Sequence, residues 1–285
     1  MLQGGLVPAR VFWLCFALLA WWGAIAGAVA QEWQHSPPEW RVLSRGLSFA
    51  QVQVFHRGEG VGTLAVVKID PALNAFRVRH HAEPQSLTDW QAELNAPVVF
   101  NASYFCQGGN PCGLVVADGK LLGPLSNRAM RGMFVAEPKG ISPDLPRAAI
   151  LDLTRNPVNP RKLPWTQGVQ SFPLLVDVQG RIRVGASPKK AYRTVIATDR
   201  QGNILVFNTL NDYFTLHDLA RFLKASQFEI ACALNLDGGS QAQLYIKTPD
   251  FQFFSPPLWE ARLRDLVDWR RFALHTVVAV YPRSQ

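Results

Sequence analysis

Short segments in which apolar and polar residues alternate recur along most of the chain, a pattern typical of half-buried β-strands. Gln51–Phe55 is a clear example, and the apolar run Pro97–Phe100 predicts a buried strand that delivers Asn101 to its end. Asp118-Gly119 lies between two such segments and predicts a hairpin, because Asp-Gly supplies the positive φ angles of a tight turn. Further strands are expected at residues 63–69, 75–78, 148–153, 174–177, 194–197, 204–208, 232–236 and 273–280.

Two segments have the spacing of α-helices. The clearer one runs from about Leu216 to Ala225, with Thr215 placed to cap it and Asp218 at the position of a capping box. A shorter helix is expected from Thr88 to Leu94, capped by Thr88. Many hairpins and few helices predict an α+β fold built on a mixed, largely antiparallel sheet. The strand expected directly after the longer helix also allows a local α/β crossover.

The N-terminus has the order of residues found in a secretory signal. A single charge, Arg10, precedes the apolar stretch Val11–Trp22, and Ala28–Ala30 provides an A-x-A cleavage site before Gln31. An uncleaved membrane anchor is the alternative, since about 18 or more apolar residues can span a bilayer. We therefore expect residues 1–30 to be a signal peptide and the mature protein to be periplasmic or secreted.

The remaining chain is long enough for one domain. Removal of residues 1–30 from 285 leaves 255, and it takes away one of 29 basic residues, so the net charge falls from +8 to +7. Residues 31–49 are expected to form an extended lead-in and residues 50–282 a single domain. A basic surface favours anionic neighbours such as phosphate-bearing glycans or lipid head groups. Because the basic residues are scattered, a merely soluble surface is an equally good interpretation.

The cysteines fit an oxidising compartment. Cys106 and Cys112 bracket the Gly-rich stretch 107–111, so a disulfide that closes this short loop is expected. Zinc binding is the alternative, but two thiols without a nearby His or second Cys pair make a poor site. Cys232 lies in an apolar run and is interpreted as a buried free thiol.

The segment Asn235–Ser240 carries the most informative chemistry. A buried strand that ends in Asp237, Gly238 and Gly239 presents a carboxylate beside backbone without side chains, where a ligand can approach and free N–H groups can hold an anion. An ordinary Asp-Gly turn is the alternative. Arg193 is expected at the start of another buried strand, where its planar guanidinium could grip a phosphate. The alternative for Arg193 is a surface ion pair.

Four segments together resemble, in order, motifs of the phosphodiester glycosidase family. They are Asn101-Ala102-Ser103-Tyr104-Phe105, Gln170-Ser171-Phe172-Pro173-Leu174-Leu175, Arg193-Thr194-Val195-Ile196-Ala197 and Asn235-Leu236-Asp237-Gly238-Gly239-Ser240. The resemblance covers roughly residues 50–282, and the family includes the enzyme that uncovers mannose 6-phosphate on lysosomal hydrolases. Two departures stand out. Ser240-Gln241 replaces the usual third Gly and Ser, and Thr209–Asp212 stands where many members carry Asp-Gly-Arg.

The resemblance implies an exported hydrolase that cleaves a sugar from a glycosyl phosphodiester, a sugar-1-phosphodiester, to give free sugar and a phosphomonoester. It implies that Asp237 is the catalytic acid/base or nucleophile, and that Arg193 holds the phosphate with the Gly238 and Gly239 amides. A second carboxylate is not evident from the sequence, and Asp199 and Asp212 are its candidates. The expected substrate-binding residues are Asn101, Tyr104, Ser171, Asn235, Gly238, Gly239 and Ser240.

The alternative function is a non-catalytic envelope protein that binds phosphorylated or acidic glycans, favoured by the basic charge and by Ser240-Gln241. Nucleic acid is not an expected partner, and membrane contact is expected only through an uncleaved signal segment. The six histidines are scattered without ligand spacing, so no metal site is expected and no cofactor is required. A divalent cation with oxygen ligands near Asp237 is compatible with the sequence. The chain has no Gly-x-Ser-x-Gly elbow, which argues against an ordinary serine esterase.

Overall fold

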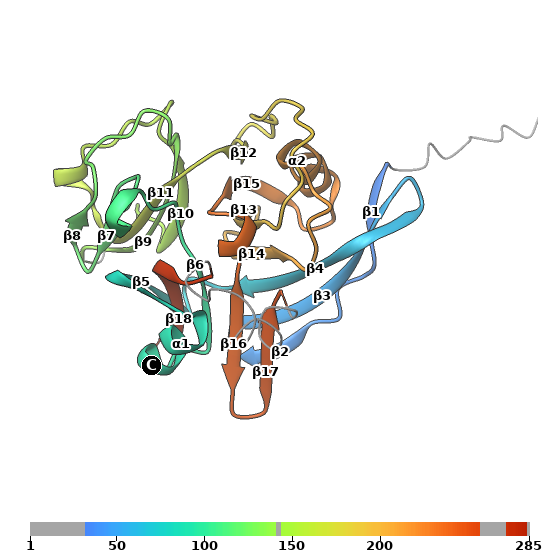
Figure 1. Ribbon diagram of the computed structural model, residues 1–285, viewed down its shortest axis with the longest axis horizontal. Coiled ribbons are helices and arrows are strands. Elements are labelled where there is room, and N and C mark those ends of the chain that lie inside the picture. The colour runs from blue at the N-terminus through green and yellow to red at the C-terminus, as the bar shows by residue number, and fades with distance from the viewer. Residues whose placement is uncertain (1–31, 141–143, 257–271, 284–285) are drawn as a thin grey trace, which may run out of the picture. The chain divides into compact units, whose positions relative to one another are not determined.

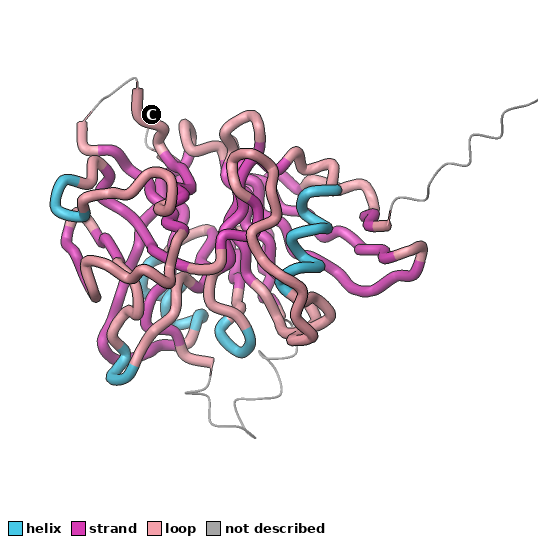
Figure 2. Tube along the Cα trace, turned by 90° about the horizontal axis from the view of Figure 1, so that it is seen from above, coloured by secondary structure: helices cyan, strands magenta, loops and turns pink. Residues whose placement is uncertain are grey.

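Three antiparallel sheets make up the fold of the described part of the chain (Figure 1). The computed structural model describes residues 32–140, 144–256 and 272–283, and the expected signal peptide lies outside them. Figure 2 shows that strands dominate the described chain and that helical segments are few. Each strand ladder in the described ranges is antiparallel, which confirms the predicted α+β, largely antiparallel class. No helix within these ranges is long and apolar enough to cross a membrane.

The first sheet carries one side of the candidate site. Its strand order is β1 (Trp33–His35), β3 (Leu47–His56), β4 (Glu59–Ile69), β14 (Ile204–Thr209), β13 (Thr194–Asp199), β15 (Ile230–Asn235) and β12 (Leu174–Val176), with β2 (Arg41–Ser44) also paired to β3. The segment expected as an extended lead-in therefore supplies β1, β2 and the beginning of β3. Strand β13 is antiparallel to both β14 and β15, so those two strands run parallel to each other.

Helix α2 (Leu216–Ala225) connects β14 to β15 and thus forms the local α/β crossover that the sequence allows (Figure 1). Its N-cap is Thr215, as predicted, because the threonine side chain accepts the N–H of Asp218 at 3.1 Å and its hydroxyl donates to the Asp218 carboxylate at 2.8 Å. Leu219, Phe222 and Leu223 are fully buried against one face of the first sheet. This packing fixes the strand ends that the helix joins.

Two smaller sheets complete the fold. One has the order β10 (Ala148–Asp152), β9 (Gly132–Pro138), β11 (Trp165–Ser171), β7 (Val115–Ala117) and β8 (Lys120–Leu122), and β7 and β8 form the predicted Asp118-Gly119 hairpin. The other has the order β17 (Phe251–Ser255), β16 (Leu244–Thr248), β6 (Val98–Asn101), β18 (Leu274–Pro282) and β5 (Asn74–Gln85). Short 3-10 turns lie at Gln107–Gly109, Pro160–Lys162 and Gly239–Gln241.

Helix α1 (Leu87–Leu94) corrects one prediction. Its N-cap is Ser86 and not Thr88, since Ser86 has extended backbone angles and its hydroxyl accepts the Asp89 N–H at 3.1 Å. The Asp89 carboxylate also accepts the Ser86 hydroxyl at 2.6 Å. A Ser three residues before an acidic residue thus decides the helix start.

One hydrophobic core joins the three sheets. Phe49 on β3, Phe100 on β6 and Phe134 on β9 belong to a single buried cluster that also takes in Ile196 and Leu234 from β13 and β15. Because strands of different sheets pack into this shared core, the positions of their ends relative to one another are fixed. The candidate site lies where three of these ends meet.

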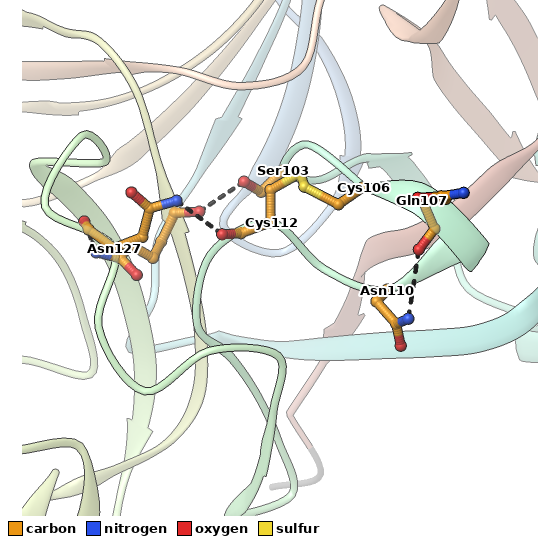
Figure 3. Close-up of a disulfide and its surroundings, with 7 residues drawn as sticks. Ser103, Cys106, Gln107, Asn110, Cys112 and Asn127 are labelled. Atoms are coloured by element: carbon orange, nitrogen blue, oxygen red, sulfur yellow. Dashed lines mark hydrogen bonds between the residues drawn. A yellow bond between two sulfur atoms is a disulfide. The ribbon is translucent and has the colours of Figure 1, made fainter.

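The predicted Cys106–Cys112 disulfide is confirmed, with 5.1 Å between the Cα atoms (Figure 3). Backbone hydrogen bonds support the loop, among them Cys106 N–H to the Asn110 carbonyl and Cys112 N–H to the Tyr104 carbonyl. The Asn127 side chain donates to the Cys112 carbonyl at 2.8 Å and fixes the outer side of the loop. Cys232 is buried and free, also as predicted.

A Cys106→Ser/Cys112→Ser variant is expected to lose about 2 kcal/mol of unfolding free energy, because the closed loop is short and restricts the unfolded chain only modestly. Urea unfolding monitored by fluorescence measures the loss. Reduction of the parent protein should shift the midpoint by the same amount. An unchanged midpoint in both experiments would show that the loop's own hydrogen bonds hold it without the disulfide.

Candidate active site

The ends of β6, β13 and β15 meet at one place. Asn101 ends β6 and donates from Nδ2 to the Asp237 carbonyl at 2.8 Å, while the Asp237 N–H donates to the Ala102 carbonyl at 3.1 Å. Asn235 ends β15 and pairs with Val195 near the start of β13. Segments more than a hundred residues apart in the sequence therefore converge at this place.

A pocket of about 320 Å³ opens at this junction. It contains Asp237 and Arg193, the two residues predicted to be catalytic, together with Tyr104, Gly238 and Gly239. Larger hollows exist elsewhere on the described surface, but their linings hold neither of the predicted catalytic residues. The remaining lining residues are Phe172, Pro173, Ser187, Lys189, Ala191 and Leu216.

The Asp237 carboxyl sits in surroundings that disfavour its charge. Burial raises the pKa of Asp237 to about 6, and the Gly238 N–H, which donates to Oδ1 at 2.8 Å, offsets only part of that rise. Among the described residues, no cation forms an ion pair with it. A carboxyl with such a pKa is mostly ionised at neutral pH and still exchanges its proton readily, which suits acid/base chemistry.

Arg193 is a buried cation held by neutral groups. Its side chain is 7% exposed, and it donates to the carbonyls of Lys189 at 2.9 Å and Phe214 at 3.4 Å. Burial lowers the pKa of Arg193, but an arginine remains charged. No carboxylate pairs with it within the described ranges, and its Nη1 donates to no described residue. A buried guanidinium without a counter-charge is poised to receive an anion.

The structure does not support the predicted anion nest at Gly238 and Gly239. The Gly238 N–H is taken by the Asp237 carboxylate, and the Gly239 N–H donates to the Tyr192 carbonyl at 2.9 Å. Gly238 instead permits close backbone approach, because a Cβ there would lie 3.0 Å from the Tyr192 carbonyl oxygen, and Gly239 supplies a φ of +65°. Ser240 turns to Gln241, to which its hydroxyl donates at 2.7 Å, and it does not line the pocket.

Tyr104 lines the pocket with a fixed ring. Its hydroxyl accepts from the Asn235 side chain at 2.8 Å, and its single proton is shared between the carbonyls of Phe172 at 3.1 Å and Leu236 at 3.2 Å. The ring packs against Phe172 with 4.8 Å between centroids. Burial raises the pKa of Tyr104 well above its ordinary value, so the hydroxyl stays protonated.

Three of the predicted substrate-binding residues build the scaffold and lie outside the pocket lining. Asn101, Asn235 and Ser171 are each at most 1% exposed. Ser171 donates to the Asn235 carbonyl at 2.8 Å, and Asn235 in turn holds Tyr104. Their polar side chains are needed because strand ends leave buried backbone groups that require partners.

The second carboxylate expected from the sequence is not found in the described pocket. Asp199 lies at the far end of β13 from Arg193, where its carboxylate accepts the Gln201 and Asn203 N–H groups of a turn. Asp212 is exposed and does not line the pocket. Lys189 also lines the pocket and was not predicted from the sequence. Its position four residues before Arg193 was the one available sign that a second cation would lie there.

Comparison with known proteins agrees with this geometry. Residues 94–271, more than half of the chain, match the profile of the phosphodiester glycosidase family. No curated protein matches the chain in sequence.

Two solved structures share the fold at 16% identity. The catalytic domain of zebrafish N-acetylglucosamine-1-phosphodiester alpha-N-acetylglucosaminidase, auto-inhibited by its pro-peptide, matches with a TM-score of 0.55 over 88% of this chain and 89% of its own. A hypothetical protein from Synechocystis matches with a TM-score of 0.57 over 87% of this chain, which spans 64% of that protein's length. With the sequence motifs brought to one pocket and the family profile matched across most of the fold, this chain belongs to the phosphodiester glycosidase family.

Proposed function

We propose that this protein is an exported hydrolase that releases a sugar from a glycosyl phosphodiester and leaves a phosphomonoester. The observation that carries the proposal is the buried guanidinium of Arg193, which has no carboxylate partner among the described residues and shares a pocket with the Asp237 carboxyl. A phosphodiester supplies the missing negative charge. Export rests on the N-terminal signal pattern, and the disulfide is in keeping with it.

The reaction assigned to the pocket uses Asp237 as a general base. Its carboxylate takes a proton from water while the water oxygen attacks the anomeric carbon. The bond from that carbon to the bridging oxygen breaks, and the phosphomonoester leaves with the electron pair. Arg193 stabilises the negative charge that the departing phosphate gains.

A phosphate leaving group explains why a pocket with a single carboxyl group is sufficient for the proposed reaction. Ordinary glycosidases need a second carboxyl group to protonate a basic alkoxide. A phosphomonoester is a far weaker base, with a second pKa near 6, and so departs without that proton. The proposed reaction needs no cofactor, and Asp237 is the one carboxylate among the described lining residues that a divalent cation could use.

The test is to incubate the purified protein with a panel of sugar-1-phosphodiesters and to measure the free reducing sugar. Direct attack by water should invert the anomeric configuration, which nuclear magnetic resonance reads in the first product formed. Retention would assign Asp237 the role of nucleophile. Tight binding of a panel member without any turnover would contradict the enzymatic function and support the alternative, a glycan-binding envelope protein.

Arg193→Lys is expected to lower kcat/KM by about tenfold to a hundredfold while a weaker activity survives. Lysine keeps the charge, but its single ammonium cannot donate to the Lys189 carbonyl and also reach the phosphate as a planar fork does. Steady-state kinetics on the best panel substrate measures the effect. Lys190→Ala is the matched control, because the Lys190 ammonium lies over the Tyr213 ring and does not line the pocket. Equal losses in both variants would contradict a direct role for Arg193.

A further inference from the structure

A second basic hollow, of about 580 Å³, lies beside the edge strand β5. Arg77 and Arg79 come from β5, Arg147 from the segment before β10, and Arg283 from the residue that follows β18. Its lining shares no residue with the pocket that holds Asp237. Four guanidinium groups from three segments thus gather in one concavity, although the basic residues look scattered in the sequence.

Two of the four arginines are neutralised within the protein. Arg283 forms a two-pronged pair with Glu137, at 2.7 and 2.8 Å, and Arg79 pairs with Asp118 at 3.0 Å. Arg77 and Arg147 have no ion pair and no side-chain hydrogen bond among the described residues. The hollow therefore keeps an excess of positive charge with free planar donors, which is the arrangement that binds phosphate or carboxylate.

The hollow also has an apolar wall. Tyr281 lines it, and its hydroxyl donates to the Leu94 carbonyl at 2.9 Å, so the ring is held in place. A fixed aromatic surface beside free guanidinium groups fits a sugar ring that carries an anionic group. A concave site admits such a group, whereas a lipid bilayer presents a broad flat surface.

The hollow lies at the opposite end of β13 from the pocket. Arg193 directly precedes β13, whereas Arg147 also lines a neighbouring depression with Gln201 and Gly202, in the turn that follows that strand. A strand of this length spans roughly 20 Å. One small substrate cannot occupy both places, so the hollow needs a ligand of its own or a distant part of a long one.

We propose that the hollow formed by Arg77, Arg79, Arg147, Arg283 and Tyr281 binds a phosphate-bearing segment of a glycan and thereby anchors the enzyme to an anionic polysaccharide. The choice of phosphate over other anions rests on the proposed function, whose substrate is a glycosyl phosphodiester. Binding at the hollow does not depend on turnover in the pocket. The two sites can therefore be tested apart.

The test is calorimetric titration with dextran phosphate, with neutral dextran as the blank. Arg77→Ala/Arg147→Ala should weaken binding by about tenfold or more, since each lost contact is a hydrogen bond between charged groups. Arg77→Lys/Arg147→Lys should lose less. Arg155→Ala/Arg161→Ala is the matched control, because it removes two exposed arginines that lie outside the hollow. Thermal melting of each variant verifies folding.

Hydrolysis of a small soluble sugar phosphodiester should be unchanged in Arg77→Ala/Arg147→Ala, while Asp237→Asn should bind dextran phosphate as the parent does. Failure of hydrolysis alone would therefore leave the anchoring result intact. If Arg155→Ala/Arg161→Ala weakens binding as much as Arg77→Ala/Arg147→Ala does, the effect is one of net charge and the proposal is overturned. Unchanged binding in Arg77→Ala/Arg147→Ala would also overturn it. Arginine-dependent binding to phosphatidylglycerol vesicles without binding to dextran phosphate would also overturn it, in favour of a membrane contact.

Discussion

Asp237→Asn is expected to lower kcat on a glycosyl phosphodiester by about 10²-fold or more, because the amide cannot accept the proton of the attacking water. The substitution keeps the size of the side chain and an oxygen for the Gly238 N–H. KM should change much less, since Arg193 still receives the phosphate. In the parent, activity should fall as the pH drops below about 6, where Asp237 becomes protonated.

The same substitution should stabilise the fold near neutral pH. The pKa of Asp237 is raised from 3.8 to about 6 by burial, so between these values the folded protein retains a proton that the unfolded chain has lost. The contribution of Asp237 to stability is thus fully present below about pH 3.8 and is lost as the pH rises through about 6. Asparagine has no such loss, so the free energy of unfolding of Asp237→Asn should exceed that of the parent by on the order of 2 kcal/mol at pH 7.

Kinetics and urea unfolding on the same samples check both halves of this prediction. Asp212→Asn is the matched control, because it makes the same chemical change at an exposed residue outside the pocket. It should leave kcat and the unfolding midpoint unchanged. A folded Asp237→Asn protein that hydrolyses the substrate as fast as the parent would reduce Asp237 to an ordinary turn residue.

Most strands expected from alternating or continuous apolar patterns are present, although β9 and β16, which are also largely apolar, were not predicted. A strand that buries polar side chains was harder to predict. Strand β11 contains Gln167 and Gln170, both at most 5% exposed. Gln167 accepts the Val78 N–H at the edge of β5, and Gln170 accepts the Leu114 N–H. Each glutamine satisfies a backbone group of a different segment, so its burial depends on tertiary contacts that no local pattern records.

The candidate site was predictable to the extent that its chemistry lies at strand ends. Asp237, Arg193 and Tyr104 are brought together in the pocket, because they flank the ends of β15, β13 and β6, which meet there. The hydrogen bonds of the Gly238 and Gly239 amides could not be foreseen, since their acceptors depend on how the turn closes. The sequence pattern also predicts a turn from Asp199 to Asn203 between two strands, and the structure confirms that this turn lies at the other end of β13 from Arg193.

A buried polar network connects the site to the core. Asn101 Oδ1 accepts the Thr194 hydroxyl at 2.7 Å and the Gln243 N–H at 3.1 Å, while its Nδ2 donates to the Asp237 carbonyl at 2.8 Å. The Asn208 side chain donates to the same Thr194 oxygen at 2.8 Å. The Asn101 side chain therefore ties β6 to β13 of the first sheet and to the turn that contains Asp237.

Asn101→Ala is expected to lower the unfolding free energy by about 3 kcal/mol, because it leaves the Gln243 N–H and the Asp237 carbonyl buried without their partner. It should also lower kcat, since the turn that positions Asp237 loses its tie to β6. Urea unfolding and kinetics measure the two effects, and Asn156→Ala, at an exposed position, should cost less than about 0.5 kcal/mol. Thr194→Val should be milder, and its effect should not add to that of Asn101→Ala, because the two residues share one hydrogen bond. Full additivity of the two losses would show that Asn101 and Thr194 stabilise the fold independently, and the network would then not be the unit that holds the site.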